Sequence, residues 1–183
     1  MKHFVITAVA AATWLLAGCA TDAPPPPAPA QPVAEANTWT ARLATLKAAL
    51  EASTAGTGVV IEQTADNRLR VVMPNERSFD VGRANVKRDL AQVLDKIAEG
   101  LRSATRANIL IVGHTDSTGG DSQNERLSVA RADGARDHLV TRGVLSSIVQ
   151  TEGRAAREPL ADNNTAAGRA QNRRVEIFVS EKG

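Results

Sequence analysis

The fold is decided by residues 109–131, which read ILIVGHTDSTGGDSQNERLSVAR. Four consecutive branched apolar residues, Ile109 to Val112, predict a strand that is buried on both faces. A glycine ends this strand, and a polar loop carrying Asp116 follows it. Asp121 and Ser122 then offer side chains that favour the start of a helix. The stretch is therefore predicted to run strand, loop, helix, with polar groups gathered at the strand end.

One face of the predicted helix points to a charged site. At about 100° per residue, this face collects Asn124, Leu127, Arg131, Ala135 and His138. Because Leu127 favours an inward orientation, Arg131 needs an anionic partner, since an unpaired buried charge is costly. Asp116 is the nearest candidate in the sequence. The two side chains either form a structural ion pair, or hold a ligand whose ammonium binds Asp116 and whose carboxylate binds Arg131.

A longer series of residues, in order, carries a family resemblance. The series is Gly113-His114-Thr115-Asp116, Gly119, Asn124, Leu127-Ser128, Arg131-Ala132, Gly143-Val144, Gly153, Glu158-Pro159, Asn164-Thr165, Gly168-Arg169 and Asn172-Arg173-Arg174-Val175-Glu176-Ile177. It resembles the peptidoglycan-binding OmpA-like C-terminal domain, which OmpA-type proteins share with the peptidoglycan-associated lipoproteins. The resemblance covers roughly residues 68–180.

This resemblance implies non-covalent binding of the diaminopimelate residue of the peptidoglycan stem peptide. The family's ligand aspartate falls on Asp116 and its ligand arginine on Arg131. Supporting contacts fall on Thr118, Asn124 and Arg173.

The chain departs from the family pattern near the implied site. Phe79 stands where the family has an aromatic residue beneath the site, but Gly82 stands where a polar residue is common. Gly134 lies inside the predicted helix, where glycine costs about 1 kcal/mol relative to alanine. We expect this glycine, with the small Ala135, to loosen the packing beneath Arg131.

The amino terminus has the pattern of a bacterial lipoprotein signal. Residues 1–18 combine a lysine with an apolar run of 13 residues, Phe4 to Leu16, which is shorter than the ~20 needed to span a bilayer. The run leads into Leu16-Ala17-Gly18-Cys19, which resembles a lipobox and implies a diacylglycerol on Cys19. Ala20, rather than aspartate, follows the cysteine, and this implies sorting to the outer membrane, with the domain in the periplasm.

The remaining chain divides by composition and periodicity. Residues 19–37 hold the lipidated cysteine and a Pro/Ala-rich linker that favours extended polyproline II. Residues 38–67 are predicted to form an amphipathic helix and a leading strand, and residues 68–183 the OmpA-like domain. The predicted helices are Trp39–Ala52, Asn85–Leu101, Ser122–Arg142 and a turn at Arg169–Arg173; the predicted strands are Val59–Ile61, Leu69–Met73, Ile109–Val112, Ser147–Glu152 and Val175–Val179. This order predicts an α+β two-layer sandwich, a mixed sheet with helices on one face.

Composition and motifs argue against several other functions. Removing Lys2 with the signal leaves 21 basic and 20 acidic residues, and this near-neutral balance, without a nucleic-acid motif, excludes nucleic acid as an expected partner. Two histidines, His114 and His138, and one cysteine remain in the mature chain, too few for a zinc site of the usual kind. His114, Asp116 and a nearby serine could suggest a hydrolase, but no strained Gly-x-Ser-x-Gly turn is present. We expect His114 to end its strand and to hydrogen-bond the loop. No cofactor is expected.

Three hypotheses follow. The favoured one is an outer-membrane lipoprotein that grips peptidoglycan and ties the envelope layers together. The second is a cell-wall amidase or peptidase, which needs a metal or nucleophile that the sequence does not offer. The third is an interaction subunit of a Tol-like, motility or secretion assembly, in which wall binding is secondary and the region before residue 58 provides the specialisation.

Overall fold

The computed structural model describes residues 37–80, 83–102 and 106–182. The predicted signal, Cys19 and the linker before residue 37 lie outside the described residues, as does Gly82. Residues 34–183 form one compact unit. Within the described residues, no helix is both long and apolar enough to cross a membrane.

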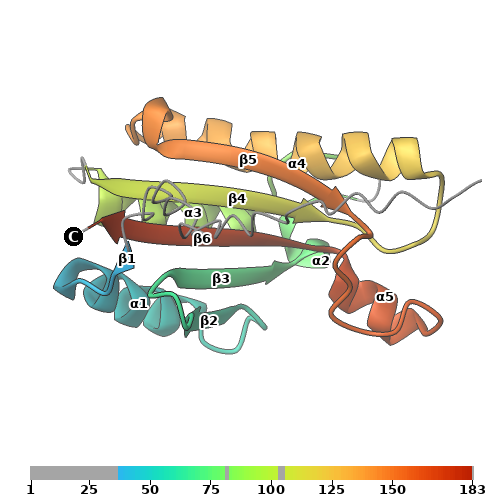
Figure 1. The fold of residues 1–183 in the computed structure, drawn as a ribbon, viewed down its shortest axis with the longest axis horizontal. Helices are drawn as coiled ribbons and strands as arrows, with labels where there is room; N and C mark the ends of the chain where they lie inside the picture. Colours follow the sequence, from blue (N-terminus) through green and yellow to red (C-terminus); the bar gives the residue numbers. More distant parts are fainter. Residues whose placement is uncertain (1–36, 81–82, 103–105, 183) are drawn as a thin grey trace, which may run out of the picture. The chain divides into compact units, whose positions relative to one another are not determined.

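The predicted α+β sandwich is confirmed. The strands are β1 (Asn37–Thr38), β2 (Val60–Gln63), β3 (Leu69–Pro74), β4 (Ala107–His114), β5 (Val149–Ala155) and β6 (Arg174–Lys182). They pair in the order β2-β3-β6-β4-β5, and β1 pairs with the end of β6. The β4–β5 pair is parallel and the other pairs are antiparallel. Figure 1 shows the resulting mixed sheet.

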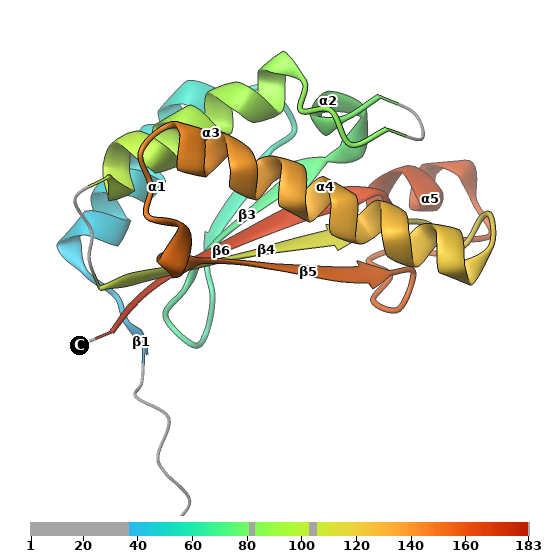
Figure 2. The same cartoon turned by 90° about the horizontal axis from the view of Figure 1, so that it is seen from above.

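The three longest helices form the second layer. The helices are α1 (Ala41–Thr54), α2 (Asn75–Ser78), α3 (Arg88–Leu101), α4 (Asp121–Thr141) and α5 (Ala166–Asn172), and a single 3₁₀ turn at Ser146–Ile148 precedes β5. Seen from above, α1, α3 and α4 lie over the same face of the sheet (Figure 2). Their apolar residues and those of the sheet face beneath them make one aliphatic core, which includes Leu43, Leu50, Leu94, Ile97, Leu139, Val71, Ile111 and Ile177.

Because helices cover one face, the prediction of a β4 strand buried on both faces is wrong along its first half. Ile109 and Ile111 point to the helices and are buried. Asn108 is exposed and Leu110 is half-buried on the opposite face. The run of four branched residues reflects the place of β4 between β6 and β5 in the sheet, and not helices packed on both of its faces.

Element ends shift from their predicted positions for local reasons. Helix α1 begins later than predicted because the Thr40 hydroxyl accepts a hydrogen bond from the Leu43 N–H and caps it. Helix α3 begins three residues later, because Val86 makes an isolated antiparallel bridge with Phe79. Helix α5 begins at Ala166, earlier than predicted, since Thr165 caps it through the Gly168 N–H.

Two glycines let α4 lie close to the sheet. Gly113 of β4 and Gly153 of β5 are register partners. A Cβ added at Gly113 would lie 2.1 Å from the Ser128 carbonyl oxygen, and one at Gly153 would lie 2.6 Å from the Ser128 hydroxyl. That hydroxyl also accepts the Ala155 N–H at 3.2 Å, which ties the end of β5 to the helix. This contact sets the height of α4 above the end of β4, where the predicted site lies.

Candidate functional site

The predicted site residues gather at the carboxyl end of β4. Asp116 and Thr118 lie in the loop between β4 and α4, and Asn124 and Arg131 lie on the inner side of α4. Arg173 stands between α5 and β6. Because β6 is antiparallel to β4 and pairs Arg174 with His114, the preceding Arg173 arrives beside the Asp116 loop. Three segments that are distant in sequence therefore meet at one end of the sheet.

Asp116 is fixed as a carboxylate. Its Oδ1 accepts the Thr118 N–H at 2.9 Å and also the Thr118 hydroxyl, and its Oδ2 accepts Arg173 Nη1 at 2.8 Å. Burial alone would raise the pKa of Asp116, but the hydrogen bonds from Thr118 and Arg173 outweigh it and lower the pKa below its ordinary value. The side chain is therefore an anion with one oxygen held by the loop and the other by Arg173.

Arg131 is a buried cation with a different set of contacts. The residue is 2% exposed. Its Nε donates to the Arg83 carbonyl at 3.2 Å, and its guanidinium carbon lies 5.4 Å from the centre of the Phe79 ring. Burial, reinforced by the positive charge of Arg173 and partly offset by Asp116, lowers the pKa of Arg131 to about 10. Phe79 therefore packs beneath the site, as the family resemblance implied.

The direct Asp116–Arg131 ion pair considered from the sequence is not formed. Among the residues that the structure describes, Arg131 has no carboxylate within 4.0 Å, and the partner of Asp116 is Arg173. The reason is the strand register, which brings Arg173 to the loop, while Arg83 and Phe79 hold Arg131. The structural ion-pair alternative is therefore wrong for this pair, and ligand binding by the two side chains stays a prediction.

Asn124 and Thr118 shape the loop. The Asn124 side-chain amide donates to the backbone carbonyls of Asp116 at 3.3 Å and of Thr118 at 2.9 Å. It fastens the loop to the first turn of α4. Both residues therefore hold Asp116 in place. The supporting contacts with a ligand that the resemblance implies for them stay a prediction.

Sequence reasoning missed a second set of residues that supports the site. Asn172 is fully buried, and its Oδ1 accepts the N–H groups of Leu160 and Ala161 at 2.7 and 2.9 Å. Its Nδ2 donates to Asn163 Oδ1 at 3.0 Å. The same Asn163 oxygen also accepts the Ser117 N–H at 3.1 Å. This chain of amides joins the loop before α5 to the Asp116 loop. Asn172 stood in the family series, but its contacts depend on folding that the spacing does not show.

Gly134 tightens the packing beneath Arg131, contrary to the looser packing expected. A Cβ at this position would lie 2.8 Å from the Ala84 carbonyl oxygen. Glycine therefore allows the 83–86 segment, whose Arg83 carbonyl holds Arg131, to pack directly on α4.

We expect Gly134→Ala to lower the affinity for the ligand predicted at Arg131 while it changes the free energy of unfolding less. The added methyl pushes the Ala84 backbone outward and displaces the Arg83 carbonyl, while alanine recovers about 1 kcal/mol of helix propensity. Thermal unfolding and a binding assay on the same sample measure the two effects. A variant with wild-type affinity would show that the segment can shift without moving Arg131.

His114 ends β4 as predicted, but the predicted hydrogen bond to the loop is wrong. The side chain is buried, and both ring nitrogens lack a hydrogen-bond partner among the described residues. Its Nε2 lies 3.7 Å from Glu176 Oε1, and Arg174 lies close by in the same charged cluster. Burial, aided by Arg174 and opposed by Glu176, lowers the pKa of His114 to about 4.

This lowered pKa predicts a loss of stability in mild acid. Between pH 6.5 and 4 the unfolded chain binds a proton at His114 and the folded chain does not, so stability is complete above that window and falls as pH drops through it. The free energy of unfolding should fall by about 2 kcal/mol more in wild type than in His114→Gln between pH 7 and 4.5. Urea titrations at the two pH values test this. Equal losses in both proteins would mean that His114 is solvated.

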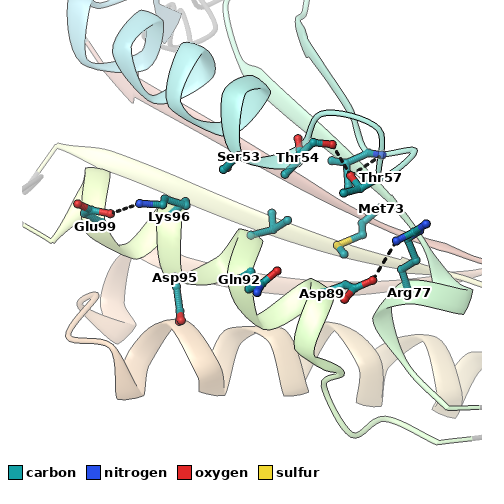
Figure 3. Close-up of a pocket in the computed structure, with 12 residues that line it drawn as sticks. Ser53, Thr54, Thr57, Met73, Arg77, Asp89, Gln92, Asp95, Lys96 and Glu99 are labelled. Atoms are coloured by element: carbon teal, nitrogen blue, oxygen red, sulfur yellow. Dashed lines mark hydrogen bonds and ion pairs between the residues drawn. The ribbon is translucent and has the colours of Figure 1, made fainter.

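A cavity lies elsewhere, between the end of α1 and α3 (Figure 3). It measures about 540 Å³ and shares no residue with the predicted site. Arg77 pairs with Asp89, and Lys96 with Glu99, on its walls. In the part of the chain that the structure describes, no group of three or more His, Cys, Asp or Glu side chains is arranged to hold a metal ion.

Comparisons with known proteins agree with the fold described above. A family model described as the OmpA family matches residues 78–173. The probable lipoprotein YiaD of Escherichia coli K12 is 42% identical over 125 residues, which are 68% of this chain and 57% of YiaD. The chain thus spans less than two thirds of that relative.

Solved structures are similar as well. The cell wall anchor of the T6SS from Pseudomonas aeruginosa is 32% identical with a TM-score of 0.65, over 74% of this chain and 96% of the anchor. The peptidoglycan-associated lipoprotein from Burkholderia pseudomallei is 29% identical with a TM-score of 0.53, over 56% of this chain and 86% of that protein.

Proposed function

The chain belongs to the OmpA family, and from this premise we propose that it is an outer-membrane lipoprotein that binds the diaminopimelate of the peptidoglycan stem peptide. The domain is non-enzymatic, like its family, so the prediction of no catalytic activity is confirmed and the hydrolase hypothesis is set aside. The proposed protein ties the outer membrane to the cell wall without turnover, metal or cofactor.

One observation carries the proposed binding. Arg131 is a buried guanidinium whose Nε is held by a carbonyl, and it has no carboxylate partner among the described residues. A buried cation of this kind costs stability unless an anion arrives to satisfy it. Asp116, an anion fixed in the same site, can take an ammonium. The ammonium and carboxylate at one end of diaminopimelate match this pair of charges.

The cell-wall role and the location rest on further support. YiaD is named a probable lipoprotein, one structural neighbour is named a peptidoglycan-associated lipoprotein and another a cell wall anchor. Cys19 is the proposed site of lipidation, and residues 20–36 the proposed spacer. The domain then works in the periplasm, held to the outer membrane by acyl chains that each contribute about 0.8 kcal/mol per buried CH₂.

Co-sedimentation with purified diaminopimelate-type peptidoglycan tests the proposal. Residues 34–183 form the compact unit and are the protein to use, because Asn37 and Thr38 pair with β6. Wild type should pellet with the wall. Asp116→Asn should stay in solution, because removing one member of a buried charged contact costs about 2–5 kcal/mol. Circular dichroism confirms folding, and a folded wild type that stays in solution would refute the proposal.

An alternative function has one specific observation in its favour. The T6SS cell wall anchor matches this chain over 96% of its own length, which supports a subunit of an envelope assembly in which wall binding is secondary. Crosslinking in cells with Asp116→Asn separates the two functions. A tether loses its crosslinks when it leaves the wall, whereas an assembly subunit keeps a protein adduct.

A further inference from the structure

A hollow separate from the candidate site lies on the face of the sheet opposite α1, α3 and α4 (Figure 2). It measures about 350 Å³, and its lining includes Arg68, Asn108, Leu110, Gln150, Phe178 and Ser180. In the strand register, Leu110 pairs with both Gln150 and Phe178, and Asn108 pairs with Ser180. Because paired residues point to the same face of a sheet, side chains from β5, β4 and β6 come together in this hollow.

Three polar side chains in the hollow have no hydrogen-bond partner among the residues that the structure describes. They are the exposed amides of Asn108 and Gln150, and the hydroxyl of Ser180, a residue that is only 9% exposed. Each amide offers both donors and an acceptor. A buried hydroxyl normally has a partner, so the free hydroxyl of Ser180 points to a ligand that supplies one.

The charged side chains around the hollow are already paired. Arg68 Nε lies 2.7 Å from Asp66 Oδ2. Arg70, the register partner of Phe178, contacts carboxylates of Glu62 and Glu176 at 2.7 and 2.9 Å. Because these pairs balance the local charge, an ionic ligand would have to break one of them to gain a partner. The hollow therefore suits a neutral ligand.

The hollow also has an apolar part. Leu110 and Phe178 are half-buried neighbours on β4 and β6. The guanidinium carbon of Arg68 lies 4.5 Å from the centre of the Phe178 ring, which holds the ring in place. An apolar floor with a few polar groups around it is typical of small-ligand sites. The matching ligand is neutral, with one apolar face and several hydroxyl or amide groups at its edge.

We infer that this hollow binds an N-acetylated sugar of the peptidoglycan glycan strand, as a second contact with the wall besides the Asp116 site. This inference rests on the proposed function, in which the glycan strand carries the stem peptide. The sugar ring presents a C–H face to Leu110 and Phe178. Its hydroxyl and acetamido groups hydrogen-bond the side chains of Asn108, Gln150 and Ser180.

The bound sugar belongs to a different repeat of the wall from the stem peptide at Asp116. Asn108 and His114 lie six residues apart along β4, which corresponds to about 20 Å. Diaminopimelate is the third residue of the stem peptide, so the sugar that carries it lies within about 10 Å. The two contacts therefore engage separate repeats, and the second strengthens the hold on intact wall through effective concentration.

An amide NMR titration of residues 34–183 tests the inference. The probe is glycan strands from which every stem peptide has been cut. The side-chain NH₂ signals of Asn108 and Gln150 should shift in wild type and in Asp116→Asn alike, while that of Gln92, exposed on α3, stays in place. Because neutral hydrogen bonds contribute little each, this contact alone is weak. It shows at high glycan concentration and does not bring Asp116→Asn down with the wall.

The double variant Asn108→Ala, Gln150→Ala locates the contact. It should bind the stripped strands about tenfold more weakly, the usual worth of one or two neutral hydrogen bonds. Gln92→Ala removes a similarly exposed amide from the other layer and is the matched control, with wild-type affinity expected. The double variant should bind a soluble disaccharide–tripeptide like wild type, because that ligand is too short to reach from Asp116 to the hollow.

Three results would overturn the inference and leave the proposed function standing, provided that wild type still pellets with intact wall. They are the absence of shifts at Asn108 and Gln150, wild-type affinity of the double variant for the stripped strands, and shifts that follow protein concentration without glycan. The last result would assign the hollow to a second copy of the chain. A folded wild type that binds neither the stripped strands nor the disaccharide–tripeptide would overturn the proposed function as well.

Discussion

Gly113→Ala is expected to lower the free energy of unfolding by about 3 kcal/mol or more. A Cβ at this position meets the Ser128 carbonyl oxygen at 2.1 Å and the Ser128 carbonyl carbon at 2.8 Å. Both atoms are backbone in the middle of a long helix, so they cannot turn aside as a flexible side chain would. To make room, α4 must rise from the sheet, and this opens the core along β4 and β5.

Gly120→Ala is the matched control, because nothing lies within 4 Å of its added Cβ and its φ of −83° suits any residue. We expect its stability to stay within about 0.5 kcal/mol of wild type. Urea denaturation of both variants measures the difference. Similar stabilities would mean that α4 can lift from the sheet at little cost, contrary to the close packing described above.

Arg131→Met is expected to weaken wall binding by about 30-fold or more without destabilising the fold. Methionine fills similar space against Phe79 and removes a buried charge that has no ion pair among the described residues. Replacing such a charge with an apolar side chain is often neutral or stabilising by about 1–4 kcal/mol. Loss of the proposed carboxylate contact costs about 2–5 kcal/mol of binding energy. The variant should therefore keep or raise the temperature of thermal unfolding while the fraction that sediments with the wall falls.

Arg174→Met provides the contrast. Arg174 is 3% exposed, as buried as Arg131, but its Nε lies 2.6 Å from Glu176 Oε1. Arg70 contacts the same carboxylate at 2.9 Å, so the variant breaks a buried network. It should lose about 3 kcal/mol of stability. If Arg131→Met lowers the free energy of unfolding by as much, Arg131 stabilises the fold, and the proposal that it serves to bind a ligand is wrong.

The layer architecture could be predicted from sequence because its causes are local. The run Ile109 to Val112 and the leucine spacing of residues 90–101 specify strand and helix by periodicity alone. The meeting of Asp116 and Arg131 at one end of the sheet also follows from a short strand–loop–helix unit. These features depend on residues close together in the chain.

The partners within the site could not be predicted in the same way. Asp116 pairs with Arg173 because of the β4–β6 register, which joins segments 57 residues apart. Arg131 is held by a backbone carbonyl, and every residue has one, so no side-chain pattern marks Arg83. Helix propensity alone suggests loose packing at Gly134, whereas the close approach of the Ala84 carbonyl oxygen is what requires a glycine there. Each miss concerns a contact across the tertiary fold.

The place where the chain enters the domain has a mechanical consequence. Strand β1 pairs Asn37 with Lys182 and Thr38 with Glu181, at the end of β6 far from Arg174. Figure 1 shows β1 and the β4–α4 loop at opposite ends of the sheet. If the domain is pulled between the proposed membrane anchor at its amino terminus and the ligand proposed to bind at Asp116, tension runs lengthwise along β4 and β6. The hydrogen bonds between these two antiparallel strands then bear the load together in shear, so the proposed tether would resist rupture better than a sheet whose hydrogen bonds open one after another.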